Sequence, residues 1–462
     1  MSTKLFGTDG VRGQAGTFPL DTRTVRRLGM ALVKALPRGE AAPALLVGRD
    51  TRESGEGIER DLALGAGAAG ATVVSAGVIP TPAVAHLTRS QGFAAGLVIS
   101  ASHNPYHDNG IKVFSGGGEK FTEALEAEVE AIMADASWRE PEGDAPAVAF
   151  VDEAAVYLTH ARQALGGLVP DHARRIAIDC ANGATYQVGP ALLHGLGFDV
   201  TMIGCEPDGR NINFECGSTH PERLARLVVE DGCDIGVAFD GDGDRAIFID
   251  HTGRIVDGDA VMYLCAKQML LTGRLHGPAV VATVMSNIGL EIALRTLGIR
   301  LERCPVGDKY VMEALLRDNL SIGGEQSGHV IFPDLLYTGD GIITALNVLR
   351  AIAETGRSLA ELAGELTTYP QVLVNVRVRE KKDLQTVPAV ASAIAGIEER
   401  LGDRGRLLVR YSGTEPLLRI MIEGEHQDEI RAWAATLGEA VRAAIGDRRG
   451  RVREVKPPSS WA

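Results

Sequence analysis

At positions 96–105 the sequence reads GLVISASHNP, a short apolar run of strand type that passes directly into a polar, turn-forming loop. Similar apolar runs at residues 45–48 and 72–75 come before it, and helical stretches separate the three. Strands joined by helical crossovers pair in parallel and bury both faces. Residues 45–100 therefore predict a layered α/β domain with a βαβαβ order.

The same rhythm returns twice further along the chain, over residues 175–239 and over residues 280–323. The pattern then changes, because apolar and polar residues alternate through residues 371–379, and further strand-like runs follow at 407–410 and 418–422. The sequence therefore predicts an α/β protein with three similar βαβ-type layered domains, followed by a smaller α+β C-terminal domain.

Two stretches favour extended or turn backbone and are candidate linkers, the Pro- and acid-rich residues 140–146 and the Tyr369-Pro370 step. Together with the repeating rhythm they suggest where the domains begin and end. We expect domains at residues 1–165, 166–265, 266–369 and 370–462.

Residues 65–70 match the dinucleotide-binding pattern GxGxxG. The match ends a helical stretch and precedes a strand, which is the reverse of the strand-turn-helix order of that fold. We assign these glycines to close helix packing and a helix end.

Length and composition limit the kind of protein. The 462 residues suffice for about three or four domains, and 45% apolar with 23% charged residues is typical of a globular enzyme. A net charge of −13 argues against a nucleic-acid partner, which would need a concentrated basic face. Neither a signal-type start nor a run of membrane-spanning length is found, and the six cysteines form no CxxC pair. We therefore expect a cytoplasmic protein with reduced thiols and no membrane partner.

The loop after the apolar run at 96–99 carries Ser102. Open parallel sheets place ligand sites at the carboxyl ends of their strands, so Ser102 should point into a crevice. A serine-hydrolase interpretation fails, because His103 is adjacent in the chain and no GxSxG elbow is present. A serine that accepts a phosphoryl group remains open, with Lys112 close by in sequence to neutralise it.

Residues 240–245 read DGDGDR and follow another apolar run. The carboxylates of Asp240, Asp242 and Asp244, separated by glycines, can converge on one hard divalent cation. An EF-hand calcium loop would need Gly at the sixth position and Glu at the twelfth, where this chain has Arg245 and His251. A solvated acidic turn is less favoured, because like charges this close cost stability without a counterion.

Magnesium suits such a loop, because three aspartates leave coordination positions for water or for a phosphate oxygen. The aspartates outweigh the charge of a dication, so an incoming phosphoryl group needs further positive charge. Arg245, Arg12 and Lys112 can supply it, and phosphoryl transfer needs positioning and charge neutralisation above all.

A third loop, GGEQSGH at residues 323–329, follows a short apolar run. Glu325 and Ser327 alternate, so in an extended loop both could face one ligand and bind neighbouring sugar hydroxyls. His329 could transfer protons or could be a histidine with a purely structural role.

A fourth loop, RYSGTEP at residues 410–416, is followed by Arg419. Two arginines, two hydroxyls and a backbone opened by glycine are suited to binding a phosphate that does not react.

In this order, GTDGVRG at residues 7–13 and the SASHNP, DGDGDR, GEQSGH and SGTEP segments resemble the motifs of the α-D-phosphohexomutase superfamily across almost the whole chain. The resemblance implies four domains around a central cleft, with one loop from each. It implies that Ser102 is a phosphoserine that, with Asp240, Asp242 and Asp244, binds Mg²⁺, and that Glu325 and Ser327 contact the sugar. It also implies that the distal phosphate is held by Arg410, Ser412, Gly413, Thr414 and Arg419.

Residues 4–10 and 211–222, together with Gln326, are similar to the bacterial branch of the superfamily that acts on phosphoglucosamine. The branch that acts on phosphomannose and phosphoglucose is the alternative. The resemblance implies a phosphosugar substrate, glucosamine 6-phosphate, and glucosamine 1,6-bisphosphate as intermediate and primer. Lys112, His329 and Arg12 are the candidates for proton transfer, and arginine is the poorest base of the three.

Two other classes of protein would use the same residues differently. A metal-dependent phosphatase would release inorganic phosphate, and a non-enzymatic binding protein for divalent ions or sugar phosphates would not need Ser102. The sequence does not determine the oligomeric state, and a homodimer is among the expectations.

Overall fold

The computed structural model describes residues 4–7, 9–37, 42–145, 147–171, 174–412, 415–447 and 452–455. The chain divides into two compact units, each described by itself. The first unit contains Met1–Met285 and Glu302–Gly364, and the second contains Ser286–Leu301 and Glu365–Ala462. Among the residues described, none of the helices combines the length and apolar character that a membrane crossing requires.

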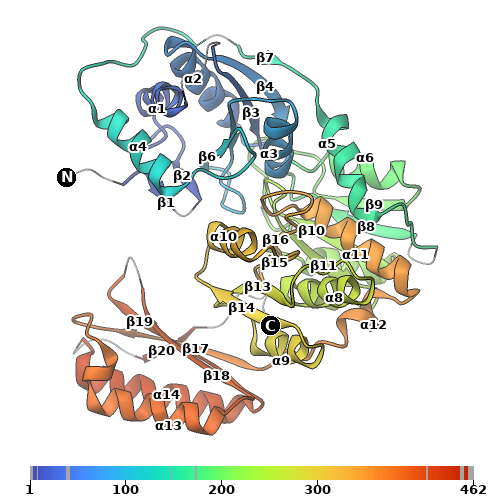
Figure 1. The fold of residues 1–462 in the computed structure, drawn as a ribbon, viewed down its shortest axis with the longest axis vertical. Helices are drawn as coiled ribbons and strands as arrows, with labels where there is room; N and C mark the ends of the chain where they lie inside the picture. Colours follow the sequence, from blue (N-terminus) through green and yellow to red (C-terminus); the bar gives the residue numbers. More distant parts are fainter. Residues whose placement is uncertain are drawn as a thin grey trace. The chain divides into compact units, whose positions relative to one another are not determined.

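The N-terminal part of the first unit is built on one mixed sheet, with strand order β1-β2-β6-β5-β3-β4-β7 in the described residues (Figure 1). Its strands are β1 (Phe6–Gly7), β2 (Gly10–Gln14), β3 (Ala44–Arg49), β4 (Thr72–Val78), β5 (Ala95–Ile99), β6 (Asp108–Ser115) and β7 (Ala149–Phe150). Its helices are α1 (Thr22–Ala35), α2 (Gly55–Ala68), α3 (Thr81–Ser90) and α4 (Glu123–Ala134). Apolar residues of α1, α2, α4 and the sheet form one buried core.

One glycine of the GxGxxG match, Gly65, lies where α2 packs on α1, whereas a Cβ atom on Gly67 or Gly70 would meet nothing within 4 Å. A Cβ atom on Gly65 would lie 2.0 Å from the Arg26 carbonyl oxygen, and one on Gly29 would lie 2.3 Å from that of Leu62. The two helix backbones can approach this closely because these positions have no side chain. The assignment of Gly65 to close helix packing is confirmed.

Two further sheets follow in the first unit. The second has order β12-β11-β10-β8-β9 and the third β14-β13-β15-β16, again for the described residues. Their strands are β8 (Arg175–Asp179), β9 (Asp199–Ile203), β10 (Ile235–Phe239), β11 (Ala246–Asp250), β12 (Ile255–Val256), β13 (Ala279–Thr283), β14 (Arg300–Cys304), β15 (Gly323–Gly324) and β16 (Val330–Ile331). Their helices are α5 (Ala154–Ala161), α6 (Val188–Gly195), α7 (Glu222–Glu230), α8 (Gly258–Leu271), α10 (Asp308–Asp318), α11 (Gly341–Thr355) and α12 (Leu359–Ala363).

All three sheets contain the same four-strand order, β4-β3-β5-β6, then β9-β8-β10-β11, then β14-β13-β15-β16. Parallel pairing is confirmed for β3 with β4 and β5, for β8 with β9 and β10, and for β13 with β15. The three sheets are mixed, because β6, β11 and β16 each pair antiparallel with the strand that precedes them. Each of these strands follows the preceding strand through a polar loop. No helical crossover lies between the two, so the second strand runs antiparallel to the first.

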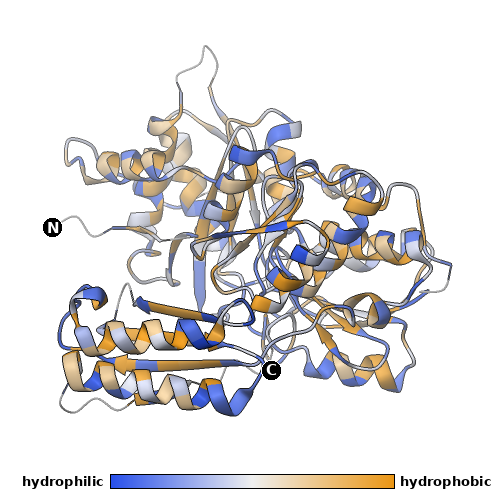
Figure 2. Cartoon of the chain, turned by 60° about the horizontal axis from the view of Figure 1, so that its bottom comes forward, coloured by the Kyte–Doolittle hydropathy of each residue, from blue (hydrophilic) through white to orange (hydrophobic). Residues whose placement is uncertain are grey.

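The second unit is an α+β structure, as predicted. Its described sheet has order β18-β19-β17-β20, from β17 (Gln371–Arg377), β18 (Arg406–Tyr411), β19 (Leu417–Glu423) and β20 (Val452–Val455). Helices α13 (Pro388–Leu401) and α14 (Gln427–Ile445) lie side by side over the sheet (Figure 1), and α9 (Ile288–Thr296) also belongs to this unit. Figure 2 shows both hydrophobic and hydrophilic residues on the two long helices. The alternating apolar residues of β17 and the next position, Val372, Val374, Val376 and Val378, are buried in the core with these helices.

Asp340 joins two helices of the first unit. Its carboxylate accepts the Ile343 N–H at 2.9 Å, which caps α11, and accepts the Tyr157 hydroxyl of α5 at 3.0 Å. Burial raises the pKa of Asp340 to about 7, compared with about 3.9 in an unfolded chain.

We expect Asp340→Asn to flatten the pH dependence of stability. Because the folded-state pKa is raised, the stabilisation is fully present below about pH 3.9 and is lost as the pH rises through about 7. This group should lower the free energy of unfolding by about 3 kcal/mol between pH 5 and pH 8, and the asparagine variant should lack that component. Urea unfolding of both proteins at the two pH values measures it, and identical pH slopes would contradict the assignment.

Candidate active site

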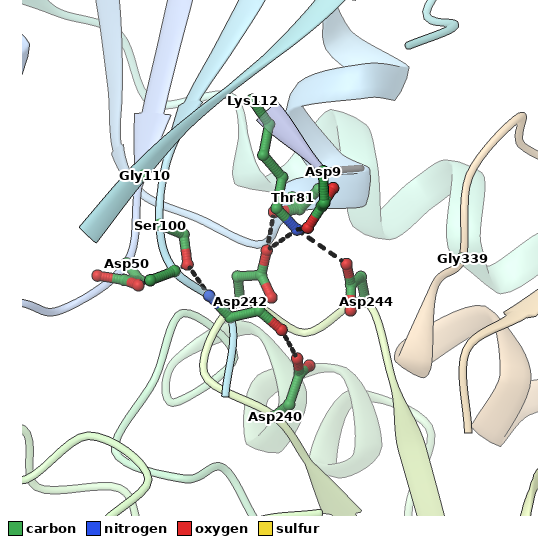
Figure 3. A network of polar contacts seen from close by, with 12 residues as sticks. Asp9, Asp50, Thr81, Ser100, Gly110, Lys112, Asp240, Asp242, Asp244 and Gly339 are labelled. Carbon is green, nitrogen blue, oxygen red and sulfur yellow. Dashed lines mark hydrogen bonds and ion pairs between the residues drawn. The ribbon is translucent and has the colours of Figure 1, made fainter. Parts of the chain in front are cut away.

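The three predicted site loops of the first unit occupy equivalent places. Residues 100–107 join β5 to β6, residues 240–245 join β10 to β11, and residues 325–329 join β15 to β16. Each loop therefore lies at the carboxyl end of the central strand of its sheet and is anchored at its far end by the antiparallel return strand. The close-up in Figure 3 shows groups from the first two loops meeting at one cluster.

Ser102 is in the expected loop, but it is buried rather than open to a crevice, with 1% of its surface exposed. The Ser102 hydroxyl donates to Asp240 Oδ2 at 2.5 Å, and His103 Nδ1 lies 3.3 Å from Ser102 Oγ. Its backbone has a φ of 52°, in the left-handed region that residues with a Cβ rarely adopt. The hydroxyl of Ser102 is thus aimed at the aspartate cluster by an unusual backbone conformation.

Asp240, Asp242 and Asp244 converge as predicted. All three are buried, and one carboxylate oxygen from each lies within 4.8 Å of the others. Lys112 Nζ reaches Asp242 Oδ2 at 2.8 Å and Asp244 Oδ2 at 3.0 Å, and Figure 3 shows it between them. Thr81, at the start of α3, also donates its hydroxyl to Asp242.

The aspartate cluster fits a hard divalent cation by its donors and by its charge. Asp242 Oδ1 and Asp244 Oδ1 are buried and make no hydrogen bond within the described part of the chain. Burial, followed by the charges of Asp244 and Asp242, raises the pKa of Asp240 well above its usual value. A dication would remove this penalty and could bind the two oxygens that make no hydrogen bond, and oxygen donors are those that Mg²⁺ prefers. The residues present therefore fit magnesium.

A cleft of about 350 Å³ lies beside the cluster. Its lining residues are Leu5, Gly7, Asp9, Gly10, Arg12, His103, Asp244, Arg245, Val306, Gly307, Asp308, Glu325 and His329. Four of the predicted site residues, Arg12, Arg245, Glu325 and His329, thus face one space. Arg12 donates to the Ala101 carbonyl at 3.5 Å, and the Arg245 amide donates to Asp240 Oδ1 at 3.2 Å. Both arginines are therefore tied to the loops that carry Ser102 and the aspartates.

The residues 325–329 form a turn, so the expectation of an extended loop is wrong. The Glu325 amide donates to the His329 carbonyl at 2.9 Å, and the Gly328 amide donates to that of Glu325 at 3.1 Å. Residues that alternate in an extended strand share a face, but here the chain reverses within four residues. Ser327 instead donates its hydroxyl to Glu325 Oε2 at 3.4 Å and is not among the residues lining the cleft.

His329 lies between two carboxylates. Its Nδ1 is 3.5 Å from Asp244 Oδ1, and its Nε2 is 3.7 Å from Asp308 Oδ2 and 3.2 Å from the Gly339 amide. Burial alone would lower the pKa of His329, but the charges of Asp244 and Asp308 raise it above the ordinary value. His103 differs, because burial and then the charges of Arg245 and Arg12 lower its pKa to about 4.

Three charged residues of this region were not identified from the sequence, namely Asp9, Lys120 and Asp308. Lys120 Nζ pairs with both Asp9 and Asp308, and Asp9 also lies 3.1 Å from Lys112 Nζ. Together they link the start of the chain to β6 and to α10. Asp9 is part of the GTDGVRG segment, but Lys120, in the loop before α4, and Asp308, the first residue of α10, belong to no comparable motif.

The fourth predicted loop lies in the second unit. Arg410 of β18 and Arg419 of β19 are directly opposite each other in the sheet register. Burial, and then the charge of Arg419, lowers the pKa of Arg410. Ser412 is buried and accepts the Glu415 amide at 3.3 Å, whereas Gly413 and Thr414 lie outside the described residues. Arg419 also pairs with the Glu415 carboxylate at 3.5 Å. Two guanidinium groups on neighbouring strands are donors suited to a phosphate.

Four family models of phosphoglucomutase/phosphomannomutase match the chain in order. They are α/β/α domain I at residues 3–140, domain II at residues 155–253, domain III at residues 257–369 and the C-terminal domain at residues 373–440. Together with the fold and the clustered loops, they define a phosphohexomutase, an isomerase of the α-D-phosphohexomutase superfamily.

Individual relatives show which family of the superfamily the chain belongs to. The phosphoglucosamine mutase of Solibacter usitatus is 48% identical over 452 residues, which are 97% of this chain and 100% of that protein. The chain belongs to the phosphoglucosamine mutase family.

Solved structures share the fold at lower identity. A phosphoglucomutase/phosphomannomutase family protein from Burkholderia thailandensis has a TM-score of 0.79 at 23% identity, covering 98% of this chain and 100% of that chain. The N-acetylphosphoglucosamine mutase of Aspergillus fumigatus, in complex with GlcNAc-6P and magnesium, has a TM-score of 0.64 at 18% identity, with 95% of each chain covered. Such neighbours show the fold of this chain and are consistent with the three repeated α/β domains.

Proposed function

We propose that the protein interconverts glucosamine 6-phosphate and glucosamine 1-phosphate through a phosphorylated Ser102. The observation that carries the proposal is the 2.5 Å contact between the Ser102 hydroxyl and Asp240 of a buried three-aspartate cluster. A phosphoryl group on Ser102 would lie beside that cluster and next to Lys112. The name of the Solibacter relative supplies the sugar, because the geometry alone does not distinguish one hexose phosphate from another.

In the reaction, the phosphoryl group passes from Ser102 Oγ to the 1-oxygen of glucosamine 6-phosphate. The phosphorus–oxygen bond to the serine breaks as the bond to the sugar forms, and the 1-hydroxyl proton leaves to a protein base. The product of this step is glucosamine 1,6-bisphosphate, which is both intermediate and primer. The bisphosphate then reorients so that its 6-phosphate faces Ser102. Its 6-phosphoryl group passes to Ser102 Oγ, and the 6-oxygen takes up a proton.

The residues around the cleft have distinct tasks in this proposal. Ser102, Asp240, Asp242 and Asp244 would hold Mg²⁺, which would supply positive charge beside the migrating phosphoryl group. Arg12 and Arg245 add positive charge from the wall of the cleft. Lys112 contacts Asp244 Oδ2, and His329 contacts Asp244 Oδ1. We assign proton transfer to Lys112 and His329.

Sugar binding and distal phosphate binding are assigned to the other two loops. Glu325 and Ser327 bind neighbouring hydroxyls, and their mutual hydrogen bond holds both side chains ready for this task. Arg410, Ser412, Gly413, Thr414 and Arg419 bind the phosphate that does not react.

The domains and the cellular setting complete the proposal. We assign the serine loop to a domain at residues 1–165, the metal loop to 166–265, the sugar loop to 266–369 and the phosphate loop to 370–462. The protein acts in the bacterial cytoplasm, as a homodimer, and its product feeds UDP-N-acetylglucosamine and peptidoglycan precursor synthesis.

Parallel assays on three sugar phosphates test the proposed substrate. With Mg²⁺ and the matching 1,6-bisphosphate, glucosamine 6-phosphate should exceed glucose 6-phosphate in kcat/KM by about tenfold or more, and mannose 6-phosphate should rank last. The intact mass of the purified protein should show one added phosphate. A first rank for mannose 6-phosphate would favour the phosphomannomutase/phosphoglucomutase alternative, and steady release of inorganic phosphate would indicate a phosphatase.

A further inference from the structure

Arg52 lies outside the predicted site, yet it makes four contacts with the serine loop. It follows β3, and 1% of its surface is exposed. Its Nη2 donates to the carbonyl oxygens of Ser102 and Asn104, each at 2.9 Å. Its Nη1 donates to those of Pro105 and Asp108, the latter at 3.0 Å. One guanidinium group thus binds the loop from Ser102 itself to the first residue of β6.

Asp50 orients that guanidinium and closes a ring of hydrogen bonds. Its carboxylate accepts the Arg52 Nε at 2.8 Å and the Ser100 hydroxyl at 2.6 Å. The Ser100 oxygen in turn accepts the Ser102 amide at 2.9 Å. Asp50, Arg52 and Ser100 therefore hold Ser102 at both its backbone N–H and its backbone carbonyl.

A residue of the second α/β sheet region reaches the same carbonyls. Asn213 Nδ2 donates to the Ser102 oxygen at 2.8 Å and lies 3.2 Å from the Asn104 oxygen. The metal loop approaches this point closely, because a Cβ atom on Gly241 would lie 2.5 Å from the Ser102 oxygen. The peptide of Ser102 is thus fixed against the loop that carries the aspartates.

This arrangement explains how Ser102 keeps a φ of 52°. A left-handed conformation is unfavourable for a residue with a Cβ, so it persists only where surrounding contacts impose it. With the backbone N–H bound to Ser100 and the carbonyl bound to Arg52 and Asn213, the hydroxyl is directed to Asp240. A displacement of about 1 Å at a reacting atom can cost a factor of about 100 in rate.

We propose that Arg52, oriented by Asp50, is a positioning residue that fixes the phosphoryl-accepting serine opposite the aspartate cluster. It acts through the backbone of the loop and does not touch the transferred group, because its donors all face carbonyl oxygens and Asp50. The rate consequence rests on the proposed role of Ser102, whereas the conformational consequence does not.

Arg52→Lys tests the inference, since lysine keeps the charge but loses the planar fork that spans the loop. Arg49→Lys is the matched control, because Arg49 ends β3 and pairs with Glu59 at 3.0 Å, and its side chain makes no hydrogen bond to the serine loop within the described residues. We expect kcat for Arg52→Lys to fall about 100-fold with KM within about twofold, and kcat for Arg49→Lys to stay within about twofold.

Ser100→Ala provides a second variant should Arg52→Lys fail to fold. This variant removes the Ser100 hydroxyl that links Asp50 to the Ser102 amide. We expect a fall in kcat of about tenfold with KM unchanged. A buried residue with only a structural role would change the melting temperature and the yield of folded enzyme, but not kcat per folded molecule. If the variants that fold keep kcat within twofold of wild type, the positioning role is wrong.

Amide hydrogen exchange separates this inference from the proposed function. Exchange of the peptide covering residues 100–108 should be faster in Arg52→Lys and Ser100→Ala than in wild type and in Arg49→Lys. Faster exchange together with a wild type that lacks mutase turnover would reject the proposed function and keep the positioning role. Unchanged exchange would reject the positioning role, whatever the activity.

Discussion

Replacing Ser102 by alanine is expected to reduce mutase turnover by at least about 10⁴-fold and to remove the added phosphate from the intact mass. The reason is that the hydroxyl carries the phosphoryl group in every turnover, and no neighbouring side chain can take over this task. His103 is the next nucleophile, with Nδ1 3.3 Å from Ser102 Oγ, but it is the Ser102 hydroxyl that donates to Asp240. Coupled turnover assays and intact mass spectrometry measure the two losses.

Ser115→Ala is a suitable control for that experiment. Ser115 ends β6 on the same sheet, and its oxygen accepts the Gly117 amide, at a distance from the aspartate cluster along the strand. This variant should keep both its phosphate and its turnover. Turnover that survives in Ser102→Ala would exclude a phosphoserine mechanism and would favour an enzyme that works without a covalent intermediate on Ser102.

The repeated domains could be predicted from the sequence because their signal is local. Apolar runs such as the one before Asp240 mark central strands, and the glycine-spaced aspartates that follow carry their chemistry within a few residues. The antiparallel return strands were missed for a physical reason. A strand such as β6 differs from a parallel neighbour only in its connection, and a polar loop of functional residues does not reveal the direction of the chain beyond it.

Contacts between distant segments could not be predicted in the same way. Lys120 and Asp308 belong to no sequence motif, and only the fold brings Lys120 to both Asp9 and Asp308. Arg52 is similar, because it lies 50 residues before Ser102, and an arginine near a strand end is usually exposed. Residues 325–329 show the opposite failure, since the local pattern was read as extended while backbone hydrogen bonds close it into a turn.

The three α/β domains position their functional loops with the same kind of strand connection. Each loop leaves a central strand and returns as an antiparallel neighbour, at β5–β6, β10–β11 and β15–β16. A loop whose two ends are both held by strand pairing has less conformational freedom than a loop that leads into a helix. Ladder hydrogen bonds fix each of its ends. The β18–β19 connection in the second unit has the same antiparallel form.

The second large effect is expected for Lys112→Met. The Lys112 ammonium contacts Asp242, Asp244 and Asp9 with 1% of its side chain exposed, so its removal leaves buried carboxylates without their cation. Breaking a buried ion pair from one side typically costs about 3–5 kcal/mol. We expect a loss of that order in the free energy of unfolding of the metal-free protein, measured by denaturant unfolding in the presence of a chelator.

Magnesium should restore much of that loss, because the dication and Lys112 neutralise the same carboxylates of Asp242 and Asp244. Lys120→Met is the matched control, since this partly buried lysine pairs with Asp9 and Asp308, which lie outside the three-aspartate cluster. Its destabilisation should persist when Mg²⁺ is added. The increment in stability on adding millimolar Mg²⁺ should therefore be larger for Lys112→Met than for Lys120→Met or wild type. Equal increments in the three proteins would mean that the ion binds away from the aspartates, and the metal assignment would then be wrong even if the enzyme requires magnesium.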